Sequence, residues 1–220
     1  MCSRFVQHLS PRAYAEIYGV GLDAPLPNAP ARWNVAPTDS ALVLRRHPQS
    51  GALALSLLRW GLVPVWSKDA SGAAKLINAR AETVTEKPSF RDAWAKRRRC
   101  LVPADGFYEW TPGPTGKVPH FITLSGGAGM ALAGLWEGWK DPASGEWLRT
   151  FTLLTCAANA AMAPLHARMP VILAQADIAR FLDDPDPRDL LAPSPVALDH
   201  HPVDPAEAKP GAAAPARASI

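Results

Sequence analysis

The sequence lacks any long hydrophobic run and any secretory leader. No stretch of about 18 uncharged apolar residues, the length that a membrane-spanning helix needs, occurs in the 220 residues. The first residues read MCSRFVQHLS, and they include Arg4 but no apolar segment of the kind that a signal peptide carries. We therefore expect a cytoplasmic protein that does not contact a membrane.

Cysteine is scarce. The sequence has only Cys2, Cys100 and Cys156, none of them in a C-x-x-C pair, and an odd number of cysteines argues against a disulfide framework. Three cysteines and a histidine can in principle hold zinc, but zinc ligands are usually clustered along the chain and these are not. We therefore expect no metal and no other cofactor.

Acidic residues are sparse in the first hundred positions. There, 15 Lys and Arg stand against 7 Asp and Glu, a net charge of +8, whereas residues 101–220 hold 8 basic and 13 acidic residues, a net charge of −5. The overall net charge of +3 hides this asymmetry. Either the solvated faces differ by chance, or the first half forms a basic surface for an anionic partner such as nucleic acid. Charge alone leaves both interpretations open.

Proline and glycine, in contrast, are abundant. Their 23 and 15 copies are spread along the chain and divide it into short elements. Apolar periodicity predicts helices over residues 11–18, 88–99 and 175–182. The last turn of the second helix would contain Lys96 to Arg99, where cations are favoured by the helix dipole.

Alternating apolar segments between turn residues predict a series of strands. They cover residues 41–46, 53–60, 100–103, 106–110, 120–124, 130–136, 149–155 and 196–203. The elements together predict one α+β domain over residues 1–203, in which short helices flank a curved, barrel-like and mainly antiparallel sheet. Residues 204–220 are rich in alanine and proline and have little to pack, so we predict a disordered tail.

Cys2 is unusual for its position. Initiator methionine is normally removed when the second residue is small, and the mature chain would then begin with an α-amine beside a thiol. The amine titrates near about 8 and a free thiol near about 8.5, whereas lysine, at about 10.4, stays protonated at neutral pH. An aldehyde would form a Schiff base with this amine, and the thiol could close on it as a five-membered thiazolidine ring. From position alone, a buried structural cysteine is the simpler interpretation.

Six motifs occur in order along the chain. They are MCSRF (1–5), WNVAPT (33–38), WGLVPVWSKD (60–69), INARAETVTEKPSFR (77–91), RRCLVPADGFYEW (98–110) and LHARMPVIL (165–173). In these motifs the chain resembles the SRAP family, the SOS-response-associated peptidases or abasic site processing proteins, from residue 2 to about residue 203. The resemblance implies a sheet-rich α+β fold with a groove for single-stranded DNA and the N-terminal cysteine at its floor.

The resemblance also assigns catalytic roles. Cys2 would be the nucleophile, and Asn78 would hydrogen-bond the amine or the opened sugar. Glu109 would be the general acid and base, and His166 a second such group or a ligand of a sugar hydroxyl. These roles suit the chemistry, because an abasic site is mainly a closed hemiacetal and its aldehyde forms only when a proton leaves one oxygen and another is delivered. Taken singly, Glu109 could equally pair with an arginine and His166 could be a core histidine.

A second set of positions is implied to contact DNA: Arg4, Asn34, Trp66, Arg80 and Arg168. Arginine suits phosphate because its planar fork donates two hydrogen bonds at once. A base stacked on Trp66 would add about 1–3 kcal/mol without selecting a sequence. The implied partner is single-stranded DNA that contains abasic sites, which would bring the protein to the nucleoid during DNA damage.

The chain departs from the family pattern at three places. Residue 3 is usually glycine, so Ser3 would be strained if the turn there needs a positive φ. Ala167 follows His166 where aspartate is common, which removes an acidic partner that could tune the histidine. After residue 203 the chain runs into DPAEAKPG instead of a further strand, which would alter the edge of the groove.

Three functions stay open. In the first, a monomeric enzyme captures abasic sites covalently, shields the lesion in the DNA damage and SOS responses, and has some lyase activity because a Schiff base acidifies the neighbouring proton. The second is a cysteine peptidase or amidohydrolase, for which release of Met1 would be a weak form of activity, but no Cys–His spacing points to a dyad. The third is a non-catalytic module that binds single-stranded DNA through the basic first half.

Overall fold

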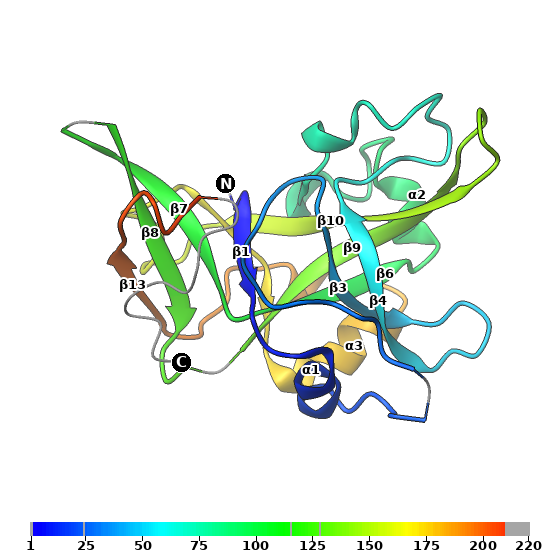
Figure 1. Cartoon of the computed structure of the whole chain (residues 1–220), viewed down its shortest axis with the longest axis horizontal. Coiled ribbons are helices and arrows are strands. Elements are labelled where there is room, and N and C mark those ends of the chain that lie inside the picture. Colours follow the sequence, from blue (N-terminus) through cyan, green and yellow to red (C-terminus); the bar gives the residue numbers. More distant parts are fainter. Residues whose placement is uncertain (1, 24, 115, 128, 210–220) are drawn as a thin grey trace.

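Strands from both ends of the chain form one of two sheets (Figure 1). The computed structural model describes residues 2–23, 25–114, 116–127 and 129–209. The first sheet has the order β13, β8, β7, β1, β2, and all its neighbours run antiparallel. Its strands span Arg4–Gln7 (β1), Arg32–Val35 (β2), Gly106–Gly113 (β7), Gly116–Leu124 (β8) and Leu198–Pro202 (β13).

The second sheet closes into a barrel. Strands β10, β4, β3, β6 and β9 follow one another, and β9 pairs back onto β10; only the contact between β10 and β4 is parallel. The barrel strands span Ser40–Arg46 (β3), Leu53–Trp60 (β4), Arg99–Ala104 (β6), Met130–Lys140 (β9) and Trp147–Ala157 (β10). The predicted curved, barrel-like and mainly antiparallel sheet is therefore confirmed.

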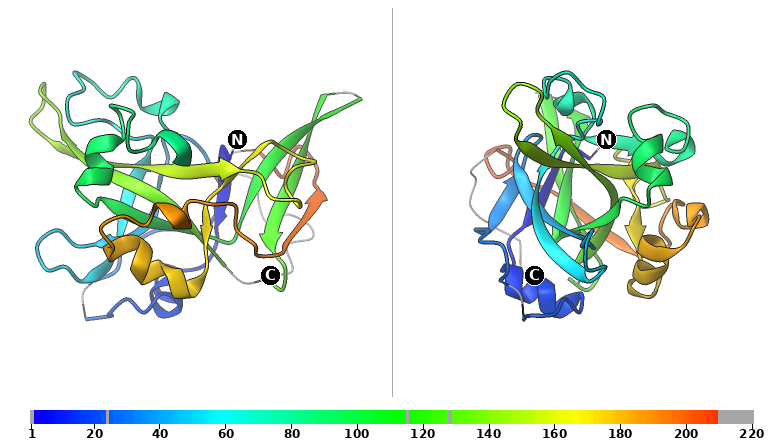
Figure 2. Two further views of the ribbon diagram at one scale, coloured as in Figure 1. Left: turned by 180° about the vertical axis from the view of Figure 1, so that it is seen from behind. Right: turned by 90° about the vertical axis from the view of Figure 1, so that its right-hand side faces the viewer.

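Three very short strands extend the barrel. Both β5 (Asn78–Arg80) and β11 (Arg168–Pro170) pair with β10, and β12 (Ile172–Leu173) pairs with β9. Figure 2 shows the first sheet beside the barrel, with the β7–β8 hairpin extending away from it. The start of β1 lies where the two sheets meet, because β1 pairs with β7 in one sheet while Asn78 on β5 of the other sheet binds Cys2, two residues before β1.

The helices are short, as predicted. The first, α1 (Pro11–Ile17), begins after Ser10, whose hydroxyl accepts a hydrogen bond from the amide of Ala13, and has proline in its first turn, where the missing N–H costs nothing. The last, α3 (Ile178–Asp183), follows a 3₁₀ turn over Gln175–Asp177. Further 3₁₀ turns span Ala73–Lys75 (η1), Ala81–Thr83 (η2) and Arg188–Leu190 (η4).

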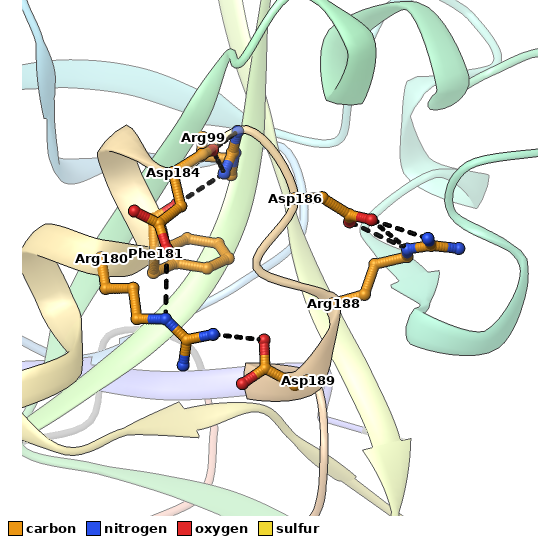
Figure 3. A network of polar contacts seen from close by, with 7 residues as sticks. All are labelled: Arg99, Arg180, Phe181, Asp184, Asp186, Arg188 and Asp189. Atoms are coloured by element: carbon orange, nitrogen blue, oxygen red, sulfur yellow. Dashed lines mark hydrogen bonds and ion pairs between the residues drawn. The ribbon is translucent and has the colours of Figure 1, made fainter.

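The predicted helix over residues 88–99 was wrong in extent. Only α2 (Arg91–Ala95) is helical, because Arg97 adopts a left-handed conformation with φ 52° that ends the helix. Arg99 instead begins β6, is buried, and donates hydrogen bonds to the carbonyl oxygens of Phe181 (2.9 Å) and Asp184 (2.7 and 2.8 Å), as Figure 3 shows. The guanidinium of Arg99 therefore binds carbonyls at the end of α3, and not the last carbonyls of α2 as the predicted helix would require.

Trp60 joins the core of the barrel to the first sheet. Its ring is fully buried, stacks on Phe151 at 6.3 Å and meets the edge of Phe5 on β1 at 4.9 Å between centroids. Its indole N–H donates to the carbonyl of Ile77 at 2.9 Å. Burial of so large a ring stabilises the fold, and this hydrogen bond fixes the chain just before Asn78.

The region predicted as a tail is only partly described. Residues 204–209 form turns, and Ala208 packs against Val6, Tyr108 and Phe121 of the first sheet. Residues 210–220 lie outside the described part of the chain, so the disorder expected there stays a prediction. No helix in the described ranges is long and apolar enough to cross a membrane.

Candidate functional site

Cys2 lies two residues before the start of β1 and is fully buried. Its backbone carbonyl accepts a hydrogen bond from the side-chain amide of Asn78 at 2.8 Å. Asn78 is held in turn by strand pairing, since β5 lies parallel to β10 with Asn78 opposite Leu153. The structure thus brings together two predicted site residues that are 76 positions apart in sequence.

Glu109 is the third member of this group. It lies on β7 and is only 3% exposed. The neighbouring Tyr108 pairs with Arg4, which places Glu109 beside the start of the chain. Burial, and after it the negative charge of Glu109, raise the pKa of the Cys2 thiol well above its ordinary value. The thiol is therefore neutral at physiological pH, and its hydrogen bond goes to the carbonyl of Arg4 at 3.7 Å.

Two predicted DNA contacts lie beside this group. The guanidinium of Arg4 donates to the side-chain oxygen of Asn34 at 3.0 Å, and Asn34 stands on β2 next to β1. Arg4 is half-buried and Asn34 is 6% exposed, so the pair can offer only part of its surface to a ligand. Arg80, at the end of β5, is exposed.

Trp66, the residue expected to stack with a base, lies on the surface. It is 61% exposed and borders a cavity of about 240 Å³ that Pro64, Lys68 and Leu76 also line. The loop that carries it is anchored to the barrel, because the indole of Trp139 donates to the carbonyl of Ser67 at 2.8 Å. A rigidly held, exposed ring of this kind suits stacking with a base.

His166 and Arg168 lie together at the start of β11. The backbone N–H of Arg168 donates to Nδ1 of His166 at 2.9 Å, and the same nitrogen lies 3.2 Å from the carbonyl oxygen of Arg168. The guanidinium of Arg168 donates to both carboxylate oxygens of Glu82, and the distance to Oε2 is 2.9 Å. It also donates to the carbonyl of Thr155 at 2.6 Å. A phosphate at Arg168 would therefore share the guanidinium with Glu82 or displace it.

Glu82 is a residue that the sequence prediction missed. Its pKa is held below the ordinary value, first by the hydrogen bond from Arg168, so it is ionised at neutral pH. The glutamate stands in the motif INARAETVTEKPSFR, but its pairing with a residue 86 positions away has no signal in the sequence. His120 was missed for a similar reason, because only the register of β7 and β8 places it opposite Glu109.

The departures at Ser3 and Ala167 do not disturb the local backbone. Among the residues that the structure covers, only Thr38 and Arg97 combine a side chain with a positive φ, so Ser3 is not strained. Ala167 is exposed, and its carbonyl accepts a hydrogen bond from the amide of Ala158 at 3.0 Å. Serine can therefore replace the glycine that is usual at position 3.

All three cysteines are free and buried. Within the described ranges, no group of three or more His, Cys, Asp or Glu side chains is placed to hold a metal ion. What the site does combine is a buried neutral thiol, an amide that holds the backbone carbonyl of the same cysteine, a buried carboxyl group and nearby arginines. Such a set suits addition to a carbonyl next to a phosphodiester chain.

The family model described as SOS response associated peptidase (SRAP) matches residues 1–209. The chain belongs to the SRAP family. Abasic site processing protein YoqW of Bacillus subtilis (strain 168) is 39% identical over 191 residues, which are 84% of each chain. Abasic site processing protein HMCES of Gallus gallus is 34% identical over 168 residues, covering 64% of this chain and 50% of that protein. The resemblance inferred from the six motifs is thereby confirmed.

Solved structures support the fold of this SRAP protein. A protein from Bacteroides thetaiotaomicron superposes with a TM-score of 0.79 at 25% identity, covering 95% of this chain and 99% of that chain. A protein from Bordetella bronchiseptica superposes with a TM-score of 0.77 at 28% identity, covering 92% and 100%. The single-domain arrangement of barrel and adjoining sheet is therefore shared along the whole of these relatives.

Proposed function

We propose that this SRAP protein processes abasic sites in single-stranded DNA by capturing them covalently at Cys2 after removal of Met1. One observation carries the proposal: Cys2 is fully buried between the two sheets, with its carbonyl held by Asn78 and its thiol within the field of Glu109. The names of the relatives in Bacillus subtilis and Gallus gallus supply the class of substrate.

The order of the chemical steps follows from the state of the thiol. Burial and Glu109 keep the thiol protonated. The α-amine belongs to a class of group that titrates at about 8 in model peptides, so it is the better first nucleophile. Amine and aldehyde give an imine and release water. The sulfur then bonds to the imine carbon while the thiol proton passes to the nitrogen, which closes the thiazolidine. No oxidant is needed.

Glu109 and Asn78 would serve different parts of this sequence. The carboxyl group of Glu109 takes the proton of the sugar hydroxyl and returns one to the ring oxygen, which opens the hemiacetal. Asn78 holds the start of the chain in place, so that amine and thiol meet the same carbon. His166, whose Nδ1 is engaged by the backbone of Arg168, would hydrogen-bond a sugar oxygen through Nε2.

The surrounding side chains would bind the strand. We assign Arg4, Asn34, Arg80 and Arg168 to phosphates and Trp66 to a base. Arg80 and Trp66 are exposed and can engage DNA directly, whereas Arg168 must first release or share Glu82. Raised salt should therefore weaken capture. Binding releases counterions from the DNA phosphates, and this release is less favourable when the salt concentration in solution is high.

The same intermediate explains the lyase activity that we propose. While the adduct is an imine, the proton on the neighbouring carbon is acidic, and its loss breaks the bond to the 3′ phosphate by β-elimination. Ring closure by the thiol competes with this step. The thiazolidine would therefore shield the lesion, and substitution of Cys2 that keeps an amine, such as Cys2→Ala, should shift the balance toward strand cleavage.

A cysteine peptidase fits the geometry less well. Such enzymes use a thiolate, which needs a lowered pKa and a histidine hydrogen-bonded to the sulfur. Here the pKa of Cys2 is raised, and the sulfur of Cys2 makes no hydrogen bond to a histidine in the described part of the chain. Nδ1 of His166 is engaged by the backbone of Arg168.

A denaturing gel tests the proposal. Purified protein is mixed with a single-stranded oligonucleotide that carries one abasic site, and the mixture is heated in detergent before electrophoresis. We expect a shifted band for the unmodified protein, none for Cys2→Ala, and slower formation for Glu109→Gln. Arg12→Ala, a change of an exposed residue on α1, is the control for folding.

Two outcomes would reject the proposal in different ways. A shift on a native gel without a band on the denaturing gel would identify a non-covalent binding module. Turnover of a peptide that Cys2→Ala abolishes, without any DNA adduct, would identify a peptidase.

A further inference from the structure

A row of titratable side chains crosses the first sheet from the buried site to its edge. Glu109 on β7 stands directly opposite His120 on β8, so both side chains leave the same face of the sheet. His200 on β13 follows, and the rings of the two histidines lie 5.7 Å apart between centroids. Exposure increases along the row, since Glu109 is buried, His120 is half-buried and His200 is exposed.

One nitrogen of His120 is held and the other has no partner. Nε2 shares a hydrogen bond with the hydroxyl of Thr111 at 3.1 Å, and Thr111 lies two residues after Glu109, on the same face of β7. Nδ1 is buried and makes no hydrogen bond with any residue that the structure describes. A buried ring nitrogen in this state is able to take up or release a proton, whereas a purely structural histidine usually has both nitrogens paired.

The surroundings keep His120 neutral. Burial lowers its pKa first, and the neighbouring His200 and His201 lower it further. The titratable groups that face the ring are Glu109 from β7 and His200 from β13; His201 leaves the other face of β13, where its ring meets Phe121 at 6.1 Å. A neutral imidazole can accept a proton at physiological pH, which a permanently charged one cannot.

The proposed reaction needs a path by which a proton can leave the buried site. The α-amine reacts only when unprotonated, so an ammonium that meets the DNA must lose one proton. A bound strand would cover the open side of the site and keep water from Glu109. The row of Glu109, His120 and His200 instead leads through the sheet to the exposed edge strand β13.

We propose that His120 is a positioning residue that acts through Glu109, carrying protons between its carboxyl group and water at the β13 edge while DNA occupies the site. The inference rests on the function proposed above. The N–H bond of the ammonium breaks as an O–H bond forms on Glu109. The carboxyl proton then moves to His120, and the imidazolium gives up its proton to water beside His200. Every step is a proton transfer, and none is an oxidation or a reduction.

The test measures the rate of adduct formation under single-turnover conditions as a function of pH. His120→Gln keeps an amide that can hydrogen-bond Thr111 but cannot carry a proton. We expect it to lower the rate roughly tenfold near neutral pH, to change the pH profile, and to be accelerated by imidazole added to the buffer. His47→Gln, the same change in the connection between β3 and β4 and outside the row, should behave like the unmodified protein.

A rate for His120→Gln within twofold of the unmodified protein at every pH would overturn the inference, and so would a slow variant that imidazole does not rescue. Thermal unfolding of both variants shows whether the sheet is intact. If the unmodified protein itself forms no adduct, the proposed function fails. If it forms one and His120→Gln is equally fast, only the role of His120 fails.

Discussion

At the residue scale, the chemistry depends on how Glu109 acts on the Cys2 thiol. The carboxylate adds to the effect of burial and raises the pKa of that thiol. Replacing Glu109 with glutamine removes the charge and keeps the shape. We expect the thiol pKa of the free protein to fall, which the pH dependence of alkylation by iodoacetamide would measure by mass spectrometry.

A control for this measurement is Glu82→Gln, which removes a carboxylate that is bound to Arg168 and that is not among the groups acting on Cys2. The thiol pKa should be unchanged in that variant. An equal fall in both variants, or a rise in Glu109→Gln, would show that Glu109 does not control the thiol.

At the scale of single elements, α3 depends on a buried arginine from another part of the chain. Arg99 is 1% exposed, donates three hydrogen bonds to the carbonyls of Phe181 and Asp184, and lies over the ring of Trp94 at 5.1 Å. Arg99→Met keeps the aliphatic stem but leaves those carbonyls without a donor. We expect the free energy of unfolding in urea to fall by about 2–4 kcal/mol.

Arg188→Ala provides the comparison, because the pair of Arg188 with Asp186 is exposed to solvent (Figure 3). Its loss should leave the unfolding midpoint close to that of the unmodified protein. If Arg99→Met unfolds at the same urea concentration as Arg188→Ala, the carbonyl contacts do not stabilise α3.

The elements that sequence reasoning predicted well are those with a local pattern. Strand β4 and helix α1 follow from alternation and from a capping serine with a following proline. Short strands such as β5 and β11 were not predicted, since three residues give no period and the pairing with β10 decides their form. The prediction of a helix over residues 88–99 was wrong because Arg97 is left-handed and Arg99 begins strand β6, and a helical pattern of side chains shows neither.

At the scale of the whole molecule, buried tyrosine and cysteine side chains make the protein less stable at alkaline pH. Burial raises the pKa of Tyr108 from 10.0 to about 12 and that of Cys156 from 9.0 to about 11. The unfolded chain loses these protons at the ordinary values while the folded protein keeps them, so the unfolded state binds fewer protons and stability falls as pH rises above about 9.

Urea unfolding at about pH 8 and about pH 10.5 measures this loss, to which each group contributes up to about 1.4 kcal/mol per pH unit. Cys156→Ala should make the decline shallower, because it removes a group whose ordinary pKa of 9.0 lies inside this range while its folded-state pKa of about 11 lies above it. A free energy of unfolding that stays constant over this range would contradict the account.

The site is also a property of the whole molecule. Its motifs could be recognised in the sequence, and they correctly indicated the family. The sequence could not show that Asn78 holds the Cys2 carbonyl or that Arg168 is engaged by Glu82, since these contacts join residues 76 and 86 positions apart. The first contact exists because the barrel sheet and the first sheet meet near the start of the chain, and the second because β5 and β11 both pair with β10.

The mass of the DNA adduct tests the central claim most directly. We predict a protein without Met1, joined to the abasic oligonucleotide with the loss of one water, stable without a reducing agent and mapping to Cys2 after digestion. Protein that retains Met1 and still forms the adduct, or an adduct that maps to a lysine, would contradict the account.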